Sequence, residues 1–189
     1  MIKRKSTLFI MLLIYFLVSC ATTKKVSDQN KNVMFAMIYD MESNPLSGAE
    51  IYINGELQGT SDVQGRFLFS DPKTDTVKIK ITKPYYSEIE TEIIFNPMQV
   101  GYFRTGTAGQ YFNIAKESLS RGDIEKAEFY ENKALELSPD RSDILYLESI
   151  ILNKKGNKKN SNEILLKIQS SDENNLYINK LKELNNEDK

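Results

Sequence analysis

The sequence predicts an α+β protein, a small antiparallel β-sandwich followed by an α-helical stack of hairpins. Two periodicities carry this prediction. Between residues 33 and 96 apolar residues recur at every second position, as on strands with one buried face. Between residues 108 and 185 they recur every three to four positions, as on amphipathic helices. A short apolar run at the N-terminus precedes both parts.

The N-terminal run is typical of an export signal. Three basic residues at positions 3–5 precede the apolar residues 8–18, a stretch too short to span a membrane as a helix. The segment ends in Leu17-Val18-Ser19-Cys20, which resembles the bacterial lipobox. The resemblance implies that residues 1–19 are a signal peptide and that Cys20 is lipidated, for example with palmitate. The alternatives are a free thiol in an apolar helix and an uncleaved signal anchor.

Cys20 is the only cysteine of the chain, and polar residues follow it, so lipidation accounts best for both features. We expect residues 20–32 to form the lipidated cysteine and a flexible tether, because they hold almost no apolar surface to bury. The expected location is extracytoplasmic, on a membrane of the bacterial envelope reached through the lipid. The residues after Cys20 do not distinguish the inner from the outer membrane.

Composition excludes several classes of function. The chain of 189 residues has no histidine, which removes imidazole bases and His metal ligands. A single cysteine allows no internal disulfide and, once lipidated, no thiol nucleophile. We therefore predict no catalytic residues, no metal and no cofactor. A pair of acidic residues in one pocket remains the enzymatic alternative.

The charge balance argues against nucleic acid as a partner. The 25 lysines and arginines include the three at positions 3–5, so 22 stand against 26 acidic residues after the signal, a formal charge of −4. Basic and acidic residues alternate along the predicted helices, as on solvated faces.

Five strands follow from the alternation of apolar and polar residues. They are expected at residues 33–39, 50–53, 66–69, 76–82 and 88–95. Turn sequences lie between them, including Asn44-Pro45-Leu46-Ser47-Gly48, Asn54-Gly55 and Asp62-Val63-Gln64-Gly65. Short strands separated by such turns predict a sandwich.

Residues 33–96 resemble the carboxypeptidase regulatory-like domain, a transthyretin-like β-sandwich. The resemblance rests on Pro45-Leu46-Ser47-Gly48-Ala49 leading into a strand, and on Thr60-Ser61-Asp62 followed by Gly65-Arg66-Phe67. Ser61 separates Thr60 from Asp62 in the second pattern. Where the family often has Gly-Tyr after its next strand, this chain has Pro84-Tyr85-Tyr86, so Tyr86 matches the tyrosine and the glycine is missing. The resemblance implies a non-catalytic spacer, packing or binding module.

Two features of this sandwich admit other interpretations. Asp62, Asp71 and Asp75 could suggest calcium, but their spacing fits no EF-type loop, and Asp before Gly is ordinary turn chemistry. Tyr85 and Tyr86 could stack on a glycan, although one closing the core and the other lying half-exposed is the simpler expectation. Residues 97–107 hold too many large apolar side chains for a free linker, so we expect a packed junction.

Helices are expected from residue 108 to residue 185. Residues 108–119 and 124–137 each carry an apolar face, with Asp123 as the predicted N-cap of the second. This hairpin resembles a tetratricopeptide repeat, with Tyr111, Ala115, Gly122, Ala127, Ala134 and Pro139 at the matching positions.

A second, degenerate copy follows the first hairpin. Serines replace both small alanines, at Ser149 and Ser161, and no proline closes it. Residues 174–184 are expected to form a capping helix, and residues 186–189 a polar tail.

The repeat resemblance implies a short groove for a peptide of an envelope protein. The positions matched to this groove are Phe112, Lys116, Leu119, Tyr146, Ile150 and Asn153. Aromatic and aliphatic residues at helical spacing are more often core than contact surface, which is the alternative for most of these. The sequence thus predicts a lipid-anchored, non-catalytic adaptor or assembly factor, with cell-wall glycan binding as the other candidate.

Overall fold

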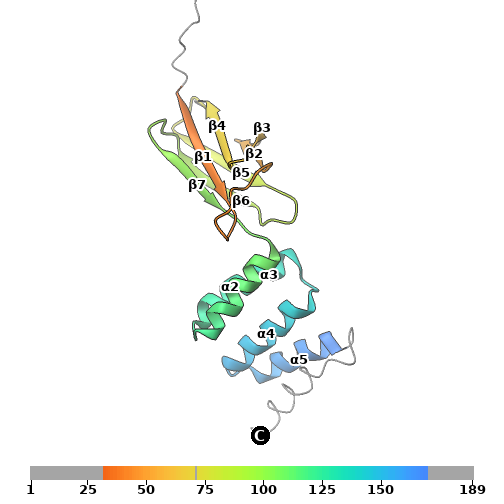
Figure 1. Ribbon diagram of the computed structural model, residues 1–189. Coiled ribbons are helices and arrows are strands. Elements are labelled where there is room, and N and C mark those ends of the chain that lie inside the picture. Colours follow the sequence, from red (N-terminus) through yellow and green to blue (C-terminus); the bar gives the residue numbers. More distant parts are fainter. Residues whose placement is uncertain (1–31, 71, 170–189) are drawn as a thin grey trace, which may run out of the picture. The chain divides into compact units, whose positions relative to one another are not determined.

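The structure of the protein, a computed structural model, describes residues 32–70 and 72–169. The predicted signal peptide, Cys20, almost all of the tether, the capping helix and the polar tail lie outside these residues. The described part is an α+β fold in which a sandwich of two sheets precedes four helices (Figure 1).

Seven strands form the two sheets. One sheet has the order β4-β1-β7 and the other the order β3-β2-β5-β6. The strands are β1 (Val33–Tyr39), β2 (Glu50–Ile53), β3 (Glu56–Thr60), β4 (Arg66–Ser70), β5 (Thr76–Thr82), β6 (Ile89–Ile94) and β7 (Val100–Arg104). Neighbouring strands run antiparallel, except that β7 pairs parallel with β1, with Phe35 opposite Val100 and Tyr39 opposite Arg104.

The five strands expected from alternation are present, and two further strands were not predicted. β3 was not predicted because its one large apolar side chain, Leu57, is exposed, so the strand shows no alternation of buried apolar and exposed polar residues. β7 lies inside residues 97–107, which were expected to be a packed junction outside the sandwich. The segment does pack, but by adding a strand to the sheet of β1, so the sandwich extends to Arg104.

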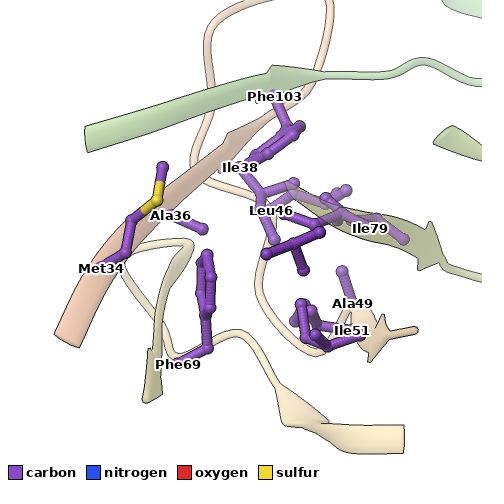
Figure 2. Close-up of a cluster of buried hydrophobic side chains, with 12 residues drawn as sticks. Met34, Ala36, Ile38, Leu46, Ala49, Ile51, Phe69, Ile79 and Phe103 are labelled. Atoms are coloured by element: carbon purple, nitrogen blue, oxygen red, sulfur yellow. The ribbon is translucent and has the colours of Figure 1, made fainter. Parts of the chain in front are cut away.

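The core lies between the two sheets and collects inward side chains of every strand except β3 (Figure 2). Ile38, Val77 and Ile79 are at most 1% exposed. Phe69 and Phe103 close the core from β4 and β7, on opposite sides of β1. Removing these side chains from water is the main force that holds the sheets together.

Ser61 forms hydrogen bonds that hold the predicted Pro45-Leu46 turn against the sandwich. Its buried hydroxyl donates to the carbonyl of Leu46 at 2.6 Å and accepts from the amide of Ala49 at 2.9 Å. Ser61, between Thr60 and Asp62, therefore satisfies two backbone groups that burial would otherwise leave unpaired. At the next turn, Asn54 and Gly55 adopt positive φ values of 50° and 87°, as the sequence predicts for a tight hairpin.

Four helices follow: α2 (Ala108–Ser120), α3 (Ile124–Leu137), α4 (Ser142–Lys154) and α5 (Lys158–Gln169). Thr107 and Gln110 form a capping box at the start of α2. Asp123 caps α3, as predicted, by accepting from the amide of Lys126 at 3.1 Å. Among the residues the structure covers, no helix is long and apolar enough to cross a membrane.

Small residues sit where the helices approach one another. Ala115, Ala127 and Ala134 are fully buried in the first hairpin. In the second, Ser149 and Ser161 are equally buried, and the Ser161 hydroxyl donates to the Ser149 carbonyl at 2.8 Å. The serines of the degenerate copy therefore keep the close approach of the alanines and add a hydrogen bond between α4 and α5.

Candidate functional site

The predicted groove residues of α2 belong mainly to the helical interior. Phe112 and Leu119 are half-buried and pack with Leu147 and Ile151 of α4. Lys116 is exposed, and its Nζ lies 5.6 Å from the centroid of the Phe112 ring. The guanidinium of Arg141 lies at the same distance from that ring. Phe112 is therefore covered by cations and helices.

The predicted groove residues of α4 lie in another environment. Tyr146, Ile150 and Asn153 are all half-buried. Tyr146 packs against Leu165 and Ile168 of α5, not against the cluster that holds Phe112. Of the predicted groove residues, Phe112 and Leu119 thus pack in one cluster and Tyr146 in another. None of the six predicted positions lines the cleft between the sandwich and the first helical hairpin or the second hollow, of the sandwich. The groove stays a prediction.

A cleft lies where the sandwich meets the first helical hairpin. We call it the junction cleft, and its volume is about 440 Å³. The sandwich side is lined by Met41, Ser87, Glu88, Ile89, Glu90, Arg104 and Thr105. The helical side is lined by Tyr111, Phe129, Tyr130 and Lys133. A volume of this size is in the range of sites that take small ligands or a few side chains.

Aromatic rings and one lysine build the helical wall of the junction cleft. Tyr130 stacks on Tyr111 with centroids 6.0 Å apart, and Phe129 meets Tyr130 edge-on at 5.1 Å. The Nζ of Lys133 lies 5.2 Å from the Phe129 centroid and 6.0 Å from that of Tyr111. Phe129 is 56% exposed, so this wall offers apolar surface beside a positive charge.

The sandwich wall is mostly polar. Glu88 is paired with Lys80 at 2.7 Å, so its charge is already balanced. Arg104 donates from Nη2 to the Ser43 hydroxyl at 3.3 Å and brings a second cation to the cleft. Glu90 is a second carboxylate of the lining, beside Glu88. The two cations and the exposed ring can contact a ligand that carries an apolar or aromatic group and a carboxylate.

Hydrogen bonds connect the two walls through the chain that joins them. Gln110 Nε2 donates to Asp40 Oδ2 at 2.9 Å, and the Gly106 amide donates to the Tyr111 hydroxyl at 2.9 Å. Burial acts to raise the pKa of Asp40, but hydrogen bonds from Asn44, Gln110 and Glu42 outweigh it and hold the pKa below its ordinary value. Asp40 is therefore a charged acceptor that links β1 to α2.

Sequence reasoning missed the residues of the junction cleft because they come from segments that it treated separately. Phe129 lies off the apolar stripe of α3, where an aromatic residue has no core to fill. Lys133 follows it by four positions, on the same face of the helix. An exposed aromatic residue next to a lysine on one helix face was the available indication.

Glu131 is the most perturbed acidic group of α3. It is 2% exposed, and its Oε1 has no hydrogen-bond partner. Burial, together with the carboxylates of Glu148 and Glu128, raises the pKa of Glu131 to about 8. Burial also raises the pKa of Glu148, against the opposing effect of Lys167. Glu131 is absent from the lining of the junction cleft, so its ionisation affects the packing of the helices and not the cleft.

The two tyrosines of the predicted glycan platform are separated by the fold. Tyr86 packs against the sandwich core, whereas Tyr85 is 89% exposed in a turn with φ of 71°. One tyrosine helps to close the core, as expected, and the other is more exposed than the half-exposed state predicted. Only one ring is thus offered for stacking.

The calcium interpretation finds no support in the residues that are described. Asp62 uses its carboxylate on the amides of Gln64 and Arg66 and on the Arg66 side chain. Asp71 lies outside the described residues. Over residues 32–70 and 72–169 no cluster of three or more acidic, histidine or cysteine residues is placed to hold a metal ion.

A second hollow, of about 570 Å³, lies between the edge strands β3 and β4. It is lined by polar groups of Asn54, Glu56, Gln58 and Ser70, and by Phe67. It is more polar than the junction cleft and lies within the sandwich.

No family model matches the chain, and no curated protein sequence does. Among solved structures, the chain is similar to 3-chlorocatechol 1,2-dioxygenase from Rhodococcus opacus 1CP, with 13% sequence identity and a TM-score of 0.30. The similarity covers 40% of this chain and 58% of that chain, so it spans little more than half of the enzyme.

Proposed function

We propose that this protein is a membrane-anchored lipoprotein that acts as a non-catalytic adaptor or assembly factor in the bacterial envelope. Three features support the proposal. The N-terminal residues resemble a lipobox ending at Cys20. The first helical hairpin resembles a tetratricopeptide repeat, a module that typically binds peptide segments. A cleft lined by both halves of the described fold supplies a binding surface.

The junction cleft is the observation that carries the binding part of the proposal. Neither half makes this cleft alone, because its walls come from β6 and β7 on one side and from α3 on the other. Binding sites are found preferentially between substructures, where apolar surface and a few polar groups converge. Phe129 is the central candidate contact, because an exposed aromatic ring in a cleft is typical of binding hot spots.

The chemistry of the cleft favours a protein segment with an apolar or aromatic side chain next to an acidic group. Lys133 and Arg104 would receive the carboxylate, and Phe129 with Met41 would contact the apolar group. The predicted groove on α2 and α4 would then lengthen the contact along the helices. With a short groove and one cleft, the affinity for an isolated peptide should be modest.

The anchor is tested by intact-protein mass spectrometry of the protein extracted from membranes. Lipidation predicts a mature mass that begins at Cys20 and carries acyl chains. A Cys20→Ser variant should carry no acyl chains, and the membrane-bound mature form should be absent for this variant. A membrane-extracted protein with an unmodified Cys20 would contradict the anchor.

The adaptor role is tested by placing a photo-crosslinking amino acid at two matched positions in cells. Phe129 lies in the cleft and Leu166 lies on α5, and their exposures are 56% and 57%. We expect crosslinks to a defined envelope protein from position 129 that are absent from position 166, and that decrease when Lys133→Glu is added. Equal crosslinking from both positions would count against the cleft.

Cell-wall glycan binding is the second candidate, and the exposed ring of Tyr85 favours it. An exposed tyrosine can stack on a sugar face, but a single ring gives little affinity. Cosedimentation of the protein with peptidoglycan, compared with a Tyr85→Ala variant, decides this case. Loss of cosedimentation in the variant would support the glycan candidate, and no cosedimentation of either protein would remove it.

A further inference from the structure

Large apolar side chains are exposed together at one end of the sandwich. Met98 is 91% exposed and Ile94 is 73% exposed. Leu68, Val100 and Phe35 are between 40% and 51% exposed. Phe35, Leu68 and Val100 lie on the outer face of one sheet and Ile94 lies on the outer face of the other, so the exposed groups surround this end of the sandwich. Exposed apolar groups of this extent are typical of a protein or membrane interaction site.

Strand pairing places these side chains at the same end. Phe35 is opposite Leu68 on one side and opposite Val100 on the other. β6 ends at Ile94 and β7 begins at Val100, so the loop that carries Met98 turns at this end (Figure 1). We call these five residues the apolar end of the sandwich.

The apolar end is also where the chain arrives from its N-terminal part. β1 begins at Val33, two residues before Phe35. Twelve residues, 21–32, separate Cys20 from β1. A chain spans at most about 3.6 Å per residue, so these residues can bridge at most about 45 Å between Cys20 and the start of β1. The connection to α2 leaves from the other end of the sheet, after Arg104 opposite Tyr39.

We propose that the apolar end of the sandwich rests on the lipid surface that holds Cys20, with Met98 and Ile94 entering the interfacial region of the bilayer. The inference rests on the proposed lipidation of Cys20. The position of the end decides between occupants, because the chain from Cys20 enters the sandwich at this end, whereas the junction cleft lies at the opposite ends of β6 and β7. The sandwich contact would orient the protein on the membrane in addition to the acyl chains.

The charges beside the apolar end indicate that insertion, not electrostatic attraction, drives the contact. Lys78 and Glu92 lie on the adjoining strands as an ion pair at 3.7 Å, and so contribute no net charge. Lys73 and Asp75, in the loop between β4 and β5 at the same end, add one charge of each sign. The contact should therefore form on vesicles of neutral phosphatidylcholine and persist at high salt.

The absence of tryptophan from the chain permits a direct test. Met98→Trp and Tyr85→Trp variants of the full lipidated protein each receive one tryptophan at a position that is about nine-tenths exposed, 91% for Met98 and 89% for Tyr85. Tyr85 lies after the end of β5, in the turn that leads to the bridge between Tyr86 and Thr107, at the end of the sandwich opposite Met98. Both variants are reconstituted in phosphatidylcholine vesicles with and without brominated acyl chains.

Bromine on the acyl chains quenches tryptophan fluorescence only when the tryptophan ring lies within the bilayer. We expect a large loss of fluorescence in the Met98→Trp variant and little loss in the Tyr85→Trp variant. Adding Ile94→Asp to Met98→Trp should reduce the loss, because a carboxylate resists insertion. Equal or absent quenching in the two variants would overturn the inference, as would shielding of the Met98→Trp position by protein without quenching by bromine.

The same samples separate the two proposals. Their intact masses report whether Cys20 carries acyl chains. A lipidated, vesicle-bound protein without quenching at position 98 would reject the membrane contact and leave the proposed function standing. An unmodified Cys20 would remove the anchor, and the membrane contact with it.

Discussion

Glu131 is buried among the fully buried alanines of α3, and its raised pKa makes the stability of the helices depend on pH. In the unfolded chain a glutamate ionises near pH 4.5, whereas in the folded protein Glu131 ionises near pH 8. Between these values the folded state binds the extra proton, so stability is full at low pH and falls as the pH rises toward 8. Each unit of difference corresponds to about 1.4 kcal/mol, so the loss from this group amounts to several kcal/mol.

The first prediction concerns Glu131→Gln, which mimics the protonated carboxyl. The variant should gain stability over the wild type at pH 8 and change little at pH 5, because the cost of burying the charge disappears. Urea unfolding of the whole chain at both pH values measures this. Glu136→Gln, an exposed position on the same helix, is the control. A variant with the same pH dependence as the wild type would contradict the assignment.

The second prediction compares two glycines that both have left-handed φ values, 71° at Gly65 and 87° at Gly55. A Cβ at Gly65 would lie 2.4 Å from the carbonyl oxygen of Ile38, and backbone cannot give way, whereas Gly55 has no atom within 4 Å of that position. Gly65→Ala should therefore cost about 3 kcal/mol or more in the free energy of unfolding. Gly55→Ala should cost about 1–2 kcal/mol, from its left-handed backbone alone. Equal losses in chemical denaturation would refute the steric account.

At the scale of elements, the alternation and the helical spacing of apolar residues were sufficient to predict a strand or helix where one of its faces is buried. β5 is the clearest strand, because Val77, Ile79 and Ile81 alternate with exposed or half-exposed residues. The N-cap at Asp123 and the turn at Asn54 were equally predictable from the sequence, because each depends on local chemistry. These elements are determined by neighbours within a few residues.

β7 and the junction cleft could not be predicted in the same way. β7 is a strand because its backbone pairs with β1, more than sixty residues earlier in the chain, and its own residues carry no clear alternation. The cleft joins β6, β7 and α3, so its residues become neighbours only once the two halves pack. Long-range pairing and packing between substructures leave little trace in a local pattern.

The third prediction concerns the close approach of the helices. Ala127 is fully buried beside Ala115 and Leu147. Ala127→Leu adds volume that these helices cannot accept and should destabilise the protein by about 1–3 kcal/mol. Lys126→Leu, at an exposed position on the same helix, should change stability by less than about 0.5 kcal/mol. Thermal unfolding monitored by circular dichroism measures both, and a tolerated leucine at position 127 would show that the helices are not closely packed there.

At the scale of the whole molecule, different parts of the chain are proposed to have different tasks. The N-terminal cysteine is proposed to hold the protein on a membrane, and the apolar end of the sandwich to contact the lipid. The junction cleft, with Phe129 and Lys133, is proposed to bind the partner. The hydrogen bond from Gln110 to Asp40 joins the sandwich to the first helix of the wall that carries the binding residues.

The fourth prediction follows from this assignment. An Asp40→Asn variant loses the charged acceptor that binds Gln110 and the Asn44 amide. Partner binding should weaken while the pattern of strands and helices in circular dichroism is kept, because the change affects the connection between the walls. Unchanged binding would show that this connection does not support the cleft.

The most direct test of the central claim is the affinity of the lipidated protein, in vesicles, for the envelope protein identified by crosslinking from position 129. Phe129→Ala should weaken binding about tenfold or more, the effect of losing a hot-spot side chain worth more than about 1.4 kcal/mol. Leu166→Ala, with a similarly exposed side chain outside the cleft, should leave the affinity unchanged. Equal affinities for the wild type and the Phe129→Ala variant would contradict the claim that the junction cleft binds the partner.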